Sequence, residues 1–323
     1  MALYTKPPCY TWPSDYFPFR EYFSSPLLRI FIIENIHHNW KWLSSFSPNF
    51  QSRDYFFVYC GWHFNQDFLK TDLEIFNTLR LNKDSFYFLF NSQVECDIYR
   101  AAGFHGEVIN HNCWIDWEAD MQIIPDANKL YDAIYVARFT PFKRHELANE
   151  VQNLALVMGD LHGSESSHAL PQFHTYKNEG ELSPAKVNSL MNQSCCGLIL
   201  SESEGACFSS SEYLISGIPV VSTHSNGGRD LWYDATNSLV VDPNPKIIAE
   251  AVKFFVAHPP EPWTIRKNHI ELAQKFRLKF IDKLEQLFSE RSVRGDAKKF
   301  FQKNFYNKMR LSEKPDFERI WPS

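Results

Sequence analysis

Length, composition and charge narrow the class of protein first. The chain has 323 residues, of which 44% are hydrophobic and 22% charged, as expected of a globular protein with about two domains. The formal net charge of −5 argues against a nucleic-acid partner, and no apolar run approaches the roughly 18–20 residues that span a bilayer. Aromatic residues reach 16%, including 28 phenylalanines, and no motif explains them.

The cysteines and the first residues indicate a cytoplasmic protein with reduced thiols. Seven cysteines are present without a CxxC pair, so we expect neither a disulfide framework nor a zinc site. The first 14 residues contain Pro7, Pro8 and Pro13 and no apolar core, so we expect no secretory signal.

The first half of the chain alternates apolar strands with helical patterns, which predicts a parallel sheet with crossover connections. We expect this domain to cover residues 1–120. Its expected strands are residues 28–33, 56–60 and 86–90, and its expected helices are residues 68–81 and 93–102.

One histidine of this half follows a predicted strand. Gly61-Trp62-His63 comes directly after residues 56–60, where a side chain can face a ligand. A histidine at such a place is more often a satisfied polar residue than a functional one, and His37 and His38 compete for the same role. With these alternatives open, His63 is a candidate catalytic residue.

The second half repeats the alternation more regularly, after a polar stretch at residues 117–129 that we interpret as a linker. The pattern predicts a doubly wound parallel sheet in a domain of residues 121–300, and the tail at residues 263–323 looks mostly helical. The expected strands are residues 133–137, 154–158, 197–200, 220–222 and 239–241, and the expected helices are residues 145–153, 184–192, 212–216 and 247–257.

Two glutamates, Glu204 and Glu212, flank a predicted turn between a strand and a helix. Ser209 and Glu212 fit a capping box with Ser209 as the N-cap, which gives Glu212 a structural role. The alternative is that Glu212 accepts hydrogen bonds from a ribose diol. Glu204 lies where open α/β sheets bind ligands, and the amides from Gly205 to Ser209 can hold an anion. The spacing gives no support to a glycosidase pair.

Two cations follow the strand at residues 133–137. Arg138 and Lys143 can both face one ligand at the carboxyl end of that strand, and a guanidinium and an ammonium suit a diphosphate. The simpler interpretation is a solvated basic turn. Further turns at Gly159-Asp160 and Asn226-Gly227-Gly228-Arg229 follow other strands. No GxGxxG or GxxxxGK[ST] motif occurs, which disfavours NAD enzymes and P-loop NTPases.

In their order and spacing, these motifs resemble those of the retaining glycosyltransferases of family 4. Glu204 and Glu212 match the E-x7-E motif, and the segment from Arg138 to Lys143 matches the arginine-to-lysine loop. The resemblance covers about residues 88–257. It implies an α/β protein of the GT-B fold, with two Rossmann-like doubly wound domains facing across a cleft. It also implies a C-terminal helix at residues 301–323 that crosses back to the first domain.

The resemblance also implies ligands and site residues. The donor would be a nucleoside-diphosphate sugar bound without a metal, a GDP-sugar slightly favoured over a UDP-sugar, and the first domain would bind a glycan or glycoprotein acceptor. By position, Arg138 and Lys143 would grip the diphosphate, Glu204 would contact the sugar and Glu212 the ribose. The base would lie near residues 177–182, which include Gly180. The amides that would touch sugar or phosphate are near Gly205, Cys207, Phe208 and Ser209.

The chain departs from this family at several positions. Cys207 and Arg144 stand where the family usually has glycine, and the early glycine-rich loop is not visible. The function favoured is a metal-independent, retaining, hexosyltransferase-type enzyme in which Arg144 faces solvent. Two alternatives stay open: a sugar-nucleotide epimerase of the same fold, and a non-catalytic sugar-nucleotide binder or interaction protein.

Overall fold

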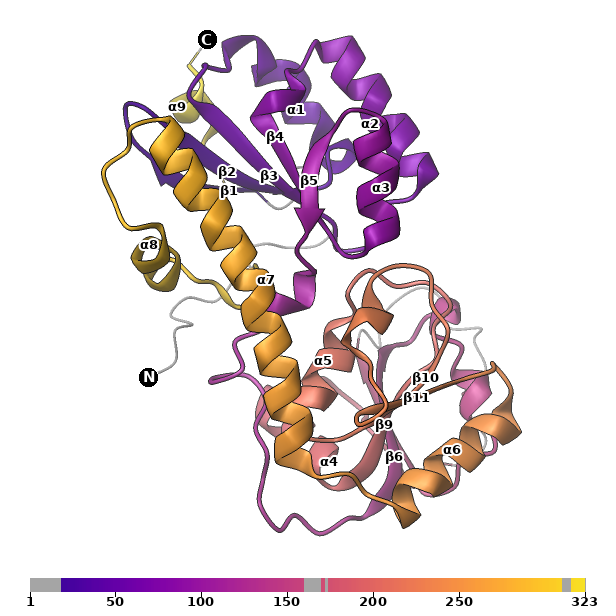
Figure 1. Cartoon of the computed structure of the whole chain (residues 1–323). Helices are drawn as coiled ribbons and strands as arrows, with labels where there is room; N and C mark the ends of the chain where they lie inside the picture. The colour runs from indigo at the N-terminus through magenta and orange to yellow at the C-terminus, as the bar shows by residue number, and fades with distance from the viewer. Residues whose placement is uncertain (1–18, 160–169, 172–173, 310–314, 323) are drawn as a thin grey trace. The chain divides into compact units, whose positions relative to one another are not determined.

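The computed structural model describes residues 19–159, 170–171, 174–309 and 315–322, which form two compact units (Figure 1). Unit 1 takes the described residues up to Asp116 and from Ala273 onward, and unit 2 runs from Trp117 to Leu272. The sequence pattern places these divisions at residues 120 and 300. Helix α7 (Pro262–Glu290) therefore starts in unit 2 and continues in unit 1. The turn expected at Asp160 lies outside the described residues.

Unit 1 contains a five-stranded sheet in the order β1-β2-β3-β4-β5. Strands β2 to β5 are parallel, and β1 pairs antiparallel with β2. The described strands thus lie in sequence order, without a reversal. The elements of unit 1 besides α7 are β1 (Phe19–Ser24), β2 (Arg29–Glu34), α1 (Trp40–Phe46), β3 (Asp54–Tyr59), α2 (Gln66–Leu79), β4 (Phe86–Phe90), α3 (Gln93–Ala101), β5 (His105–Val108), α8 (Ala297–Lys303) and α9 (Phe317–Ile320).

Aromatic side chains fill both faces of this sheet. On one face Phe31 stacks on Phe56 with 5.1 Å between ring centroids, and the Trp321 ring lies 4.8 Å from that of Phe31. On the other face Phe57 packs 4.7 Å from Phe280 of α7. Neighbouring residues of a strand point to opposite faces, so one aromatic strand supplies both layers. Most of the 28 phenylalanines belong to unit 1, and this core buries many of those that the structure describes.

Unit 2 contains a six-stranded parallel sheet in the order β11-β10-β9-β6-β7-β8. Strands β7 and β8 extend from β6 in one direction, and β9, β10 and β11 extend in the other. This is the doubly wound arrangement, with the reversal between β6 and β9. Its elements are β6 (Tyr131–Arg138), β7 (Leu154–Gly159), β8 (Tyr176–Lys177), α4 (Pro184–Asn192), β9 (Ser194–Ile199), α5 (Phe208–Ile215), β10 (Val220–Thr223), β11 (Ser238–Val241) and α6 (Pro245–Ala257).

Aliphatic side chains dominate the core of unit 2. Under α6, Ile248 and Val252 join Leu156 and Leu198 in one buried cluster. Such side chains pack at the density of organic crystals, which holds α6 against the sheet.

The opposite face is fixed by Tyr213 of α5. Its ring lies against Gly197 of β9, where an added Cβ would stand 2.2 Å from a ring carbon. Its hydroxyl accepts from the N–H of Val136 at 2.7 Å and donates to the carbonyl of Ile134 at 3.3 Å. Gly197 therefore permits the close approach that ties α5 to two strands.

Most of the expected elements are confirmed within a few residues, and β4 and α4 coincide with their predictions. The helix expected at residues 145–153 is wrong, because only the 3-10 turn His145–Ala148 forms there. A single helix at residues 301–323 is also wrong, because α8 ends at Lys303 and the described residues after it form only a 3-10 turn and the short α9. Ala148 and Val151 join the buried cluster under α6, which holds this segment as an irregular turn. Within the described residues, no helix combines the length and apolarity needed to cross a membrane.

Candidate functional site

The candidate residues of unit 2 follow neighbouring strands of its sheet. Arg138 ends β6, Lys143 lies in the turn after it, and Glu204 lies in the loop after β9. The reversal of strand order falls between these two strands. In open α/β sheets, ligands bind outside the carboxyl ends of the strands at such a reversal. The fold thus gathers these three side chains where a ligand is expected.

An ion pair joins the loops after β6 and β9. The ammonium of Lys143 contacts Oε1 of Glu204, and their side chains are only 12% and 8% exposed. The same oxygen accepts a hydrogen bond from Ser201 Oγ at 2.7 Å. The sequence predicted that Lys143 faces a diphosphate and that Glu204 contacts a sugar. The structure shows that these two side chains touch, so their roles are coupled.

Arg138 and Lys143 border one aromatic ring. The guanidinium of Arg138 lies 5.6 Å and the ammonium of Lys143 lies 4.9 Å from the ring centroid of Phe142. Arg138 is exposed, whereas Lys143 is half-buried. The site therefore offers one fixed cation and one exposed cation beside the same ring.

The loop between β9 and α5 is held by the loop after β10. The N–H of Glu204 donates to the carbonyl of Asn226 at 3.0 Å, and the N–H of Asn226 donates to Glu202 at 2.9 Å. The N–H of Gly228 donates to Gly205 at 2.9 Å. The glycine turn after β10, which was a weak signal in the sequence, is thus part of the frame around Glu204.

Helix α5 starts earlier than the capping box predicts. Its N-cap is Cys207, with φ 59° and no side-chain cap, so Phe208 and Ser209 lie in the first turn. The capping box with Ser209 as N-cap and Glu212 at N3 is wrong, because the chain turns into the helix at the left-handed Cys207. Glu212 lies one turn further along α5 and is only 8% exposed.

The left-handed backbone at Cys207 has a physical meaning. Cys207 has φ 59°, in the left-handed region that glycine adopts without a Cβ clash and that other residues adopt at a cost. Burial raises the pKa of the Cys207 thiol to about 11, and the Glu204 carboxylate adds to this rise while Lys143 and Arg229 oppose it. The thiol is therefore neutral near pH 7 and is no thiolate nucleophile.

The sequence predicts that Arg144 faces solvent, but in the structure its side chain turns inward. Its Nε donates to the carbonyl of Leu200 at 2.6 Å, and one terminal nitrogen donates to Thr223 Oγ1 at 2.7 Å. The backbone at Arg144 is left-handed, with φ 52°, and this turns the side chain back over β9 and β10. Arg144 thus links the turn after β6 to the carboxyl ends of β9 and β10.

Gly180 lies in an exposed segment tied to the end of β7. The buried Asn178 accepts from the N–H of Met158 at 2.7 Å and donates to the carbonyls of Met158 at 2.8 Å and Gly180 at 2.9 Å. Because β7 is the neighbour of β6, the segment expected to hold the base is attached to the strand beside Arg138. Asn178 was not recognised in the sequence, where one asparagine in a polar stretch carries no signal.

His63 belongs to unit 1, in the loop after β3. It is half-buried, burial lowers its pKa, and its ring centroid lies 5.5 Å from that of Trp62. The buried Asn91 holds this loop by donating to the carbonyls of Cys60 and Trp62, both at 3.1 Å. A catalytic role for His63 stays a prediction.

Further polar groups at this edge of unit 1 were not singled out in the sequence. Glu34, at the end of β2, accepts from the N–H of Gly61 at 3.0 Å, and burial raises its pKa to about 7. His111, after β5, is buried against Tyr59 with 4.6 Å between ring centroids, and burial lowers its pKa to about 3. Glu34 and His111 lie at or after the ends of different strands, so only the folded sheet brings them to the same edge.

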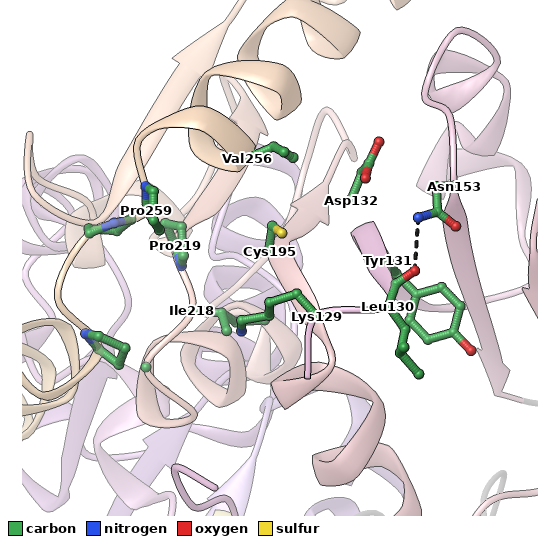
Figure 2. A pocket seen from close by; sticks show the side chains of 13 residues that line it. Lys129, Leu130, Tyr131, Asp132, Asn153, Cys195, Ile218, Pro219, Val256 and Pro259 are labelled. Atoms are coloured by element: carbon green, nitrogen blue, oxygen red, sulfur yellow. Dashed lines mark hydrogen bonds between the residues drawn. The ribbon is translucent and has the colours of Figure 1, made fainter. Parts of the chain in front are cut away.

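A cavity of about 320 Å³ opens elsewhere in unit 2 (Figure 2). Tyr131 and Cys195 on its wall lie at the amino ends of β6 and β9, whereas Arg138 and Glu204 lie at or beyond the carboxyl ends. This cavity is therefore separate from the candidate site. In the described part of the chain, no group of three or more His, Cys, Asp or Glu side chains is arranged to hold a metal ion.

Comparison with a known family agrees with this geometry. Residues 117–275 match the family described as glycosyl transferases group 1. The matched segment contains β6 to α6 and every candidate residue of unit 2. No curated protein sequence matches the chain significantly.

Solved structures share the fold of the chain. Sucrose-phosphate synthase from Thermosynechococcus elongatus gives a TM-score of 0.56 at 16% identity, over 80% of this chain and 74% of that one. Anabaena HepE in complex with UDP-glucose gives 0.53 at 16% identity, over 79% and 78%. The pneumococcal O-GlcNAc transferase GtfA in complex with UDP and GlcNAc gives 0.55 at 12% identity, over 80% and 57%. The chain has the GT-B fold that these glycosyltransferases share, as the sequence predicts.

Proposed function

We propose that this protein is a glycosyltransferase that moves a sugar from a nucleoside-diphosphate sugar to a hydroxyl group of a glycan or glycoprotein. One observation carries the proposal. Arg138 and the Lys143–Glu204 ion pair stand at the reversal of strand order, inside a segment that matches glycosyl transferases group 1. A cationic and anionic pair at this place suits a ligand with a diphosphate and a polyhydroxylated sugar.

The two cations are assigned to the leaving group. Negative charge builds on the diphosphate as the sugar–phosphate bond breaks, and preorganised donors for such charge are usually the largest catalytic term. An ammonium has three N–H donors, so Lys143 can keep its contact with Glu204 and still donate to a phosphate oxygen. Arg138 adds a second, exposed cation 5.6 Å from the centroid of the same Phe142 ring.

The remaining residues are assigned to binding. Glu204 accepts from a sugar hydroxyl and Glu212 from the ribose, while the amides from Gly205 to Ser209 meet the phosphate at the start of α5. The segment around Gly180 holds the base. The polar edge of unit 1, with His63, is assigned to the acceptor.

We infer that the donor is a UDP-sugar. HepE was solved with UDP-glucose and GtfA with UDP and GlcNAc, which supports uridine over the guanosine that the sequence analysis favours. Titration of the protein with UDP and GDP, followed by melting temperature, tests this inference. A larger stabilisation by GDP would reverse it.

Retention of the anomeric configuration and independence from metal are also proposed, because the family 4 resemblance implies the first and the two cations supply charge for the second. Proton NMR of the fresh product reads the configuration. Activity should persist in EDTA. Activity that disappears with EDTA and returns with manganese would remove the metal-independent assignment.

The central experiment incubates the protein with UDP- and GDP-sugars, with and without glycan acceptors. We expect release of nucleoside diphosphate that increases when an acceptor is added, together with a glycosylated product. Conversion of the donor sugar without an acceptor would instead identify an epimerase. Binding of the nucleotide sugar without any turnover would identify a non-catalytic binder.

A further inference from the structure

A fully buried guanidinium stands behind the candidate site, and the proposed mechanism does not use it. Arg229, at the start of the 3-10 turn Arg229–Trp232, is 0% exposed. It donates to the carbonyl of Ser201 at 3.0 Å, to Ser201 Oγ at 3.1 Å and to the carbonyl of Thr223. Its Nε donates to Asp230 at 3.1 Å. Burying a charge is costly unless it is well hydrogen-bonded, so this arrangement calls for a role.

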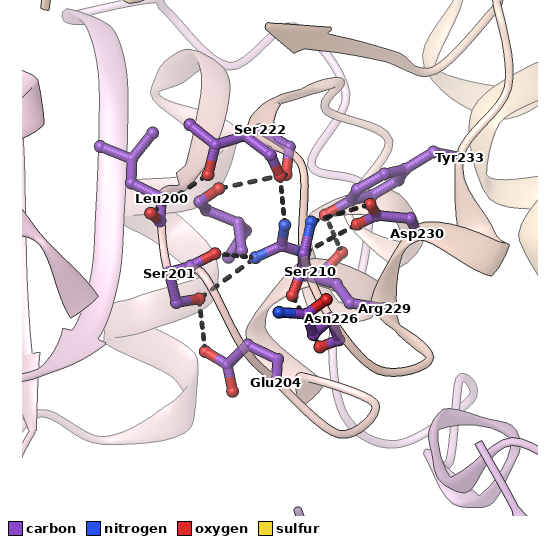
Figure 3. Close-up of polar contacts among 12 residues, drawn as sticks. Leu200, Ser201, Glu204, Ser210, Ser222, Asn226, Arg229, Asp230 and Tyr233 are labelled. Atoms are coloured by element: carbon purple, nitrogen blue, oxygen red, sulfur yellow. Dashed lines mark hydrogen bonds and ion pairs between the residues drawn. The ribbon is translucent and has the colours of Figure 1, made fainter. Parts of the chain in front are cut away.

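Ser201 connects this guanidinium to Glu204 (Figure 3). Its hydroxyl accepts from Arg229 at 3.1 Å and lies 2.7 Å from Oε1 of Glu204. A guanidinium can only donate and a carboxylate can only accept. The single proton of Ser201 must therefore point at Glu204, and Arg229 fixes this direction.

The carboxylate of Glu204 is held on one oxygen. Both hydrogen bonds that it accepts from the described residues, from Lys143 and from Ser201, go to Oε1. Two donors on one oxygen restrict rotation of the carboxylate and turn the other oxygen, Oε2, away from them. Partners that orient a ligand-contacting group in this way are commonly as important as the group itself.

We propose that Ser201 and Arg229 are positioning residues, which hold Oε1 of Glu204 so that Oε2 is presented to a hydroxyl group of the donor sugar. This inference rests on the proposed function, in which Glu204 contacts the sugar. It adds that donor specificity depends on two residues that touch neither sugar nor nucleotide. They act on the sugar and leave the nucleotide contacts unchanged.

The test compares binding of a nucleotide sugar with binding of its nucleotide by calorimetry. The probes are UDP-glucose with UDP and GDP-mannose with GDP, and the pair that the parent binds is used. Ser201→Ala removes the donor to Glu204 and keeps the carbonyl that Arg229 needs. A hydrogen bond to a charged group changes an equilibrium about 10- to 100-fold, so we expect about 10-fold weaker binding of the nucleotide sugar and unchanged binding of the nucleotide.

Two variants serve as controls. Ser201→Thr keeps the hydroxyl and should restore binding of the nucleotide sugar. Ser194→Ala removes a buried hydroxyl at the other end of β9, which donates to the carbonyl of Leu190 at 2.8 Å, and should leave both affinities unchanged.

A double-mutant cycle shows whether Ser201 acts through Glu204. In the Glu204→Ala background, Ser201→Ala should cause no further loss. Arg229→Lys should weaken binding of the nucleotide sugar more than that of the nucleotide. If Arg229→Lys does not fold, the result for Ser201→Ala alone decides the positioning role.

The outcomes separate the two proposals. Equal weakening of sugar nucleotide and nucleotide by Ser201→Ala, or no change in either, would overturn the positioning role. If Glu204→Ala leaves binding of the nucleotide sugar intact, the assigned role of Glu204 fails and the positioning role with it. A parent that binds neither probe pair would overturn the proposed function itself.

Discussion

Both units contain a parallel sheet, to which unit 1 adds one antiparallel edge strand, but their cores differ. Unit 1 packs aromatic rings on both faces of strands that lie in sequence order. Unit 2 packs aliphatic side chains under α6 and reverses its strand order between β6 and β9. In open α/β sheets, ligands bind outside the carboxyl ends of the strands at such a reversal.

The carboxyl edges of the two sheets also differ, in whether their side chains are charged. In unit 2, charged side chains form an ion pair between two loops. In unit 1, burial raises the pKa of Glu34 to about 7 and that of Glu95 to about 8, and it lowers the pKa of His111 to about 3. The edge in unit 2 thus carries a pair of charged side chains, whereas burial in unit 1 favours the uncharged forms of Glu34, Glu95 and His111. This contrast supports the proposal of a diphosphate in unit 2 and a hydroxyl acceptor in unit 1.

The largest expected effect tests the charge in unit 2. Arg138→Ala and Lys143→Ala should each lower kcat about 100- to 1,000-fold, because each removes a preorganised donor for the departing diphosphate. Steady-state kinetics at saturating donor measure this. Lys246→Ala, an exposed cation at the start of α6, is the charge-matched control and should leave kcat unchanged. Loss of donor affinity alone in the first two variants would place the diphosphate elsewhere.

The next effect tests the packing that positions the site. Gly197→Ala should lower the free energy of unfolding by about 1–3 kcal/mol, because the new Cβ would stand 2.2 Å from the Tyr213 ring and displace α5. Denaturant titration measures the change. Gly159→Ala places its Cβ where no heavy atom of the described residues lies within 4 Å, and should have little effect. Equal stability of the two variants would show that the Tyr213 ring of α5 does not pack closely against Gly197 of β9.

The third prediction tests suppressed charge in unit 1. Burial raises the pKa of Glu95 from 4.5 to about 8, and its Oε2 accepts from the N–H of Asn91 at 2.8 Å. Between these pH values the folded state holds a proton that the unfolded state has lost, so the stability of the parent falls as pH rises. Glu95→Gln keeps the shape without this penalty.

Glu95→Gln should therefore match the parent near pH 4 and exceed it at pH 8 by on the order of 4 kcal/mol. Urea titrations at several pH values measure the difference. Glu74→Gln, on the exposed side of α2, should show no such dependence on pH. A Glu95→Gln variant that is less stable than the parent at pH 8 would mean that the native carboxyl is ionised and paired.

The smallest effect concerns Glu212. Because it does not stand at N3 of α5, a cap no longer accounts for it. Glu212→Gln should weaken UDP binding about 10-fold, through loss of a charged acceptor for the ribose, while the melting temperature hardly changes. Calorimetry and a thermal melt on the same sample measure both. Unchanged affinity with a lower melting temperature would return Glu212 to a structural role.

Local signals in the sequence were sufficient for much of the fold. Residues 86–90 and 184–192 form the expected strand and helix, and Gly217 ends α5 with φ 75° as expected of a C′ glycine. The spacing of Arg138, Lys143 and Glu204 along alternating strands and helices indicated that they share one edge of a sheet. These inferences succeed because apolar periodicity and turn chemistry act over a few neighbouring residues.

By itself, the sequence determined the alternation of strands and helices, the doubly wound unit 2 and the side chains expected at its edge. Only the tertiary structure decided how those side chains are held: Arg144 turned inward, α5 beginning at the left-handed Cys207, and Ser201 bonded to Arg229, 28 positions away. The physical reason is that a buried polar group takes whichever partner the packed chain brings within about 3 Å. That partner lies far away along the chain, so no local pattern specifies it.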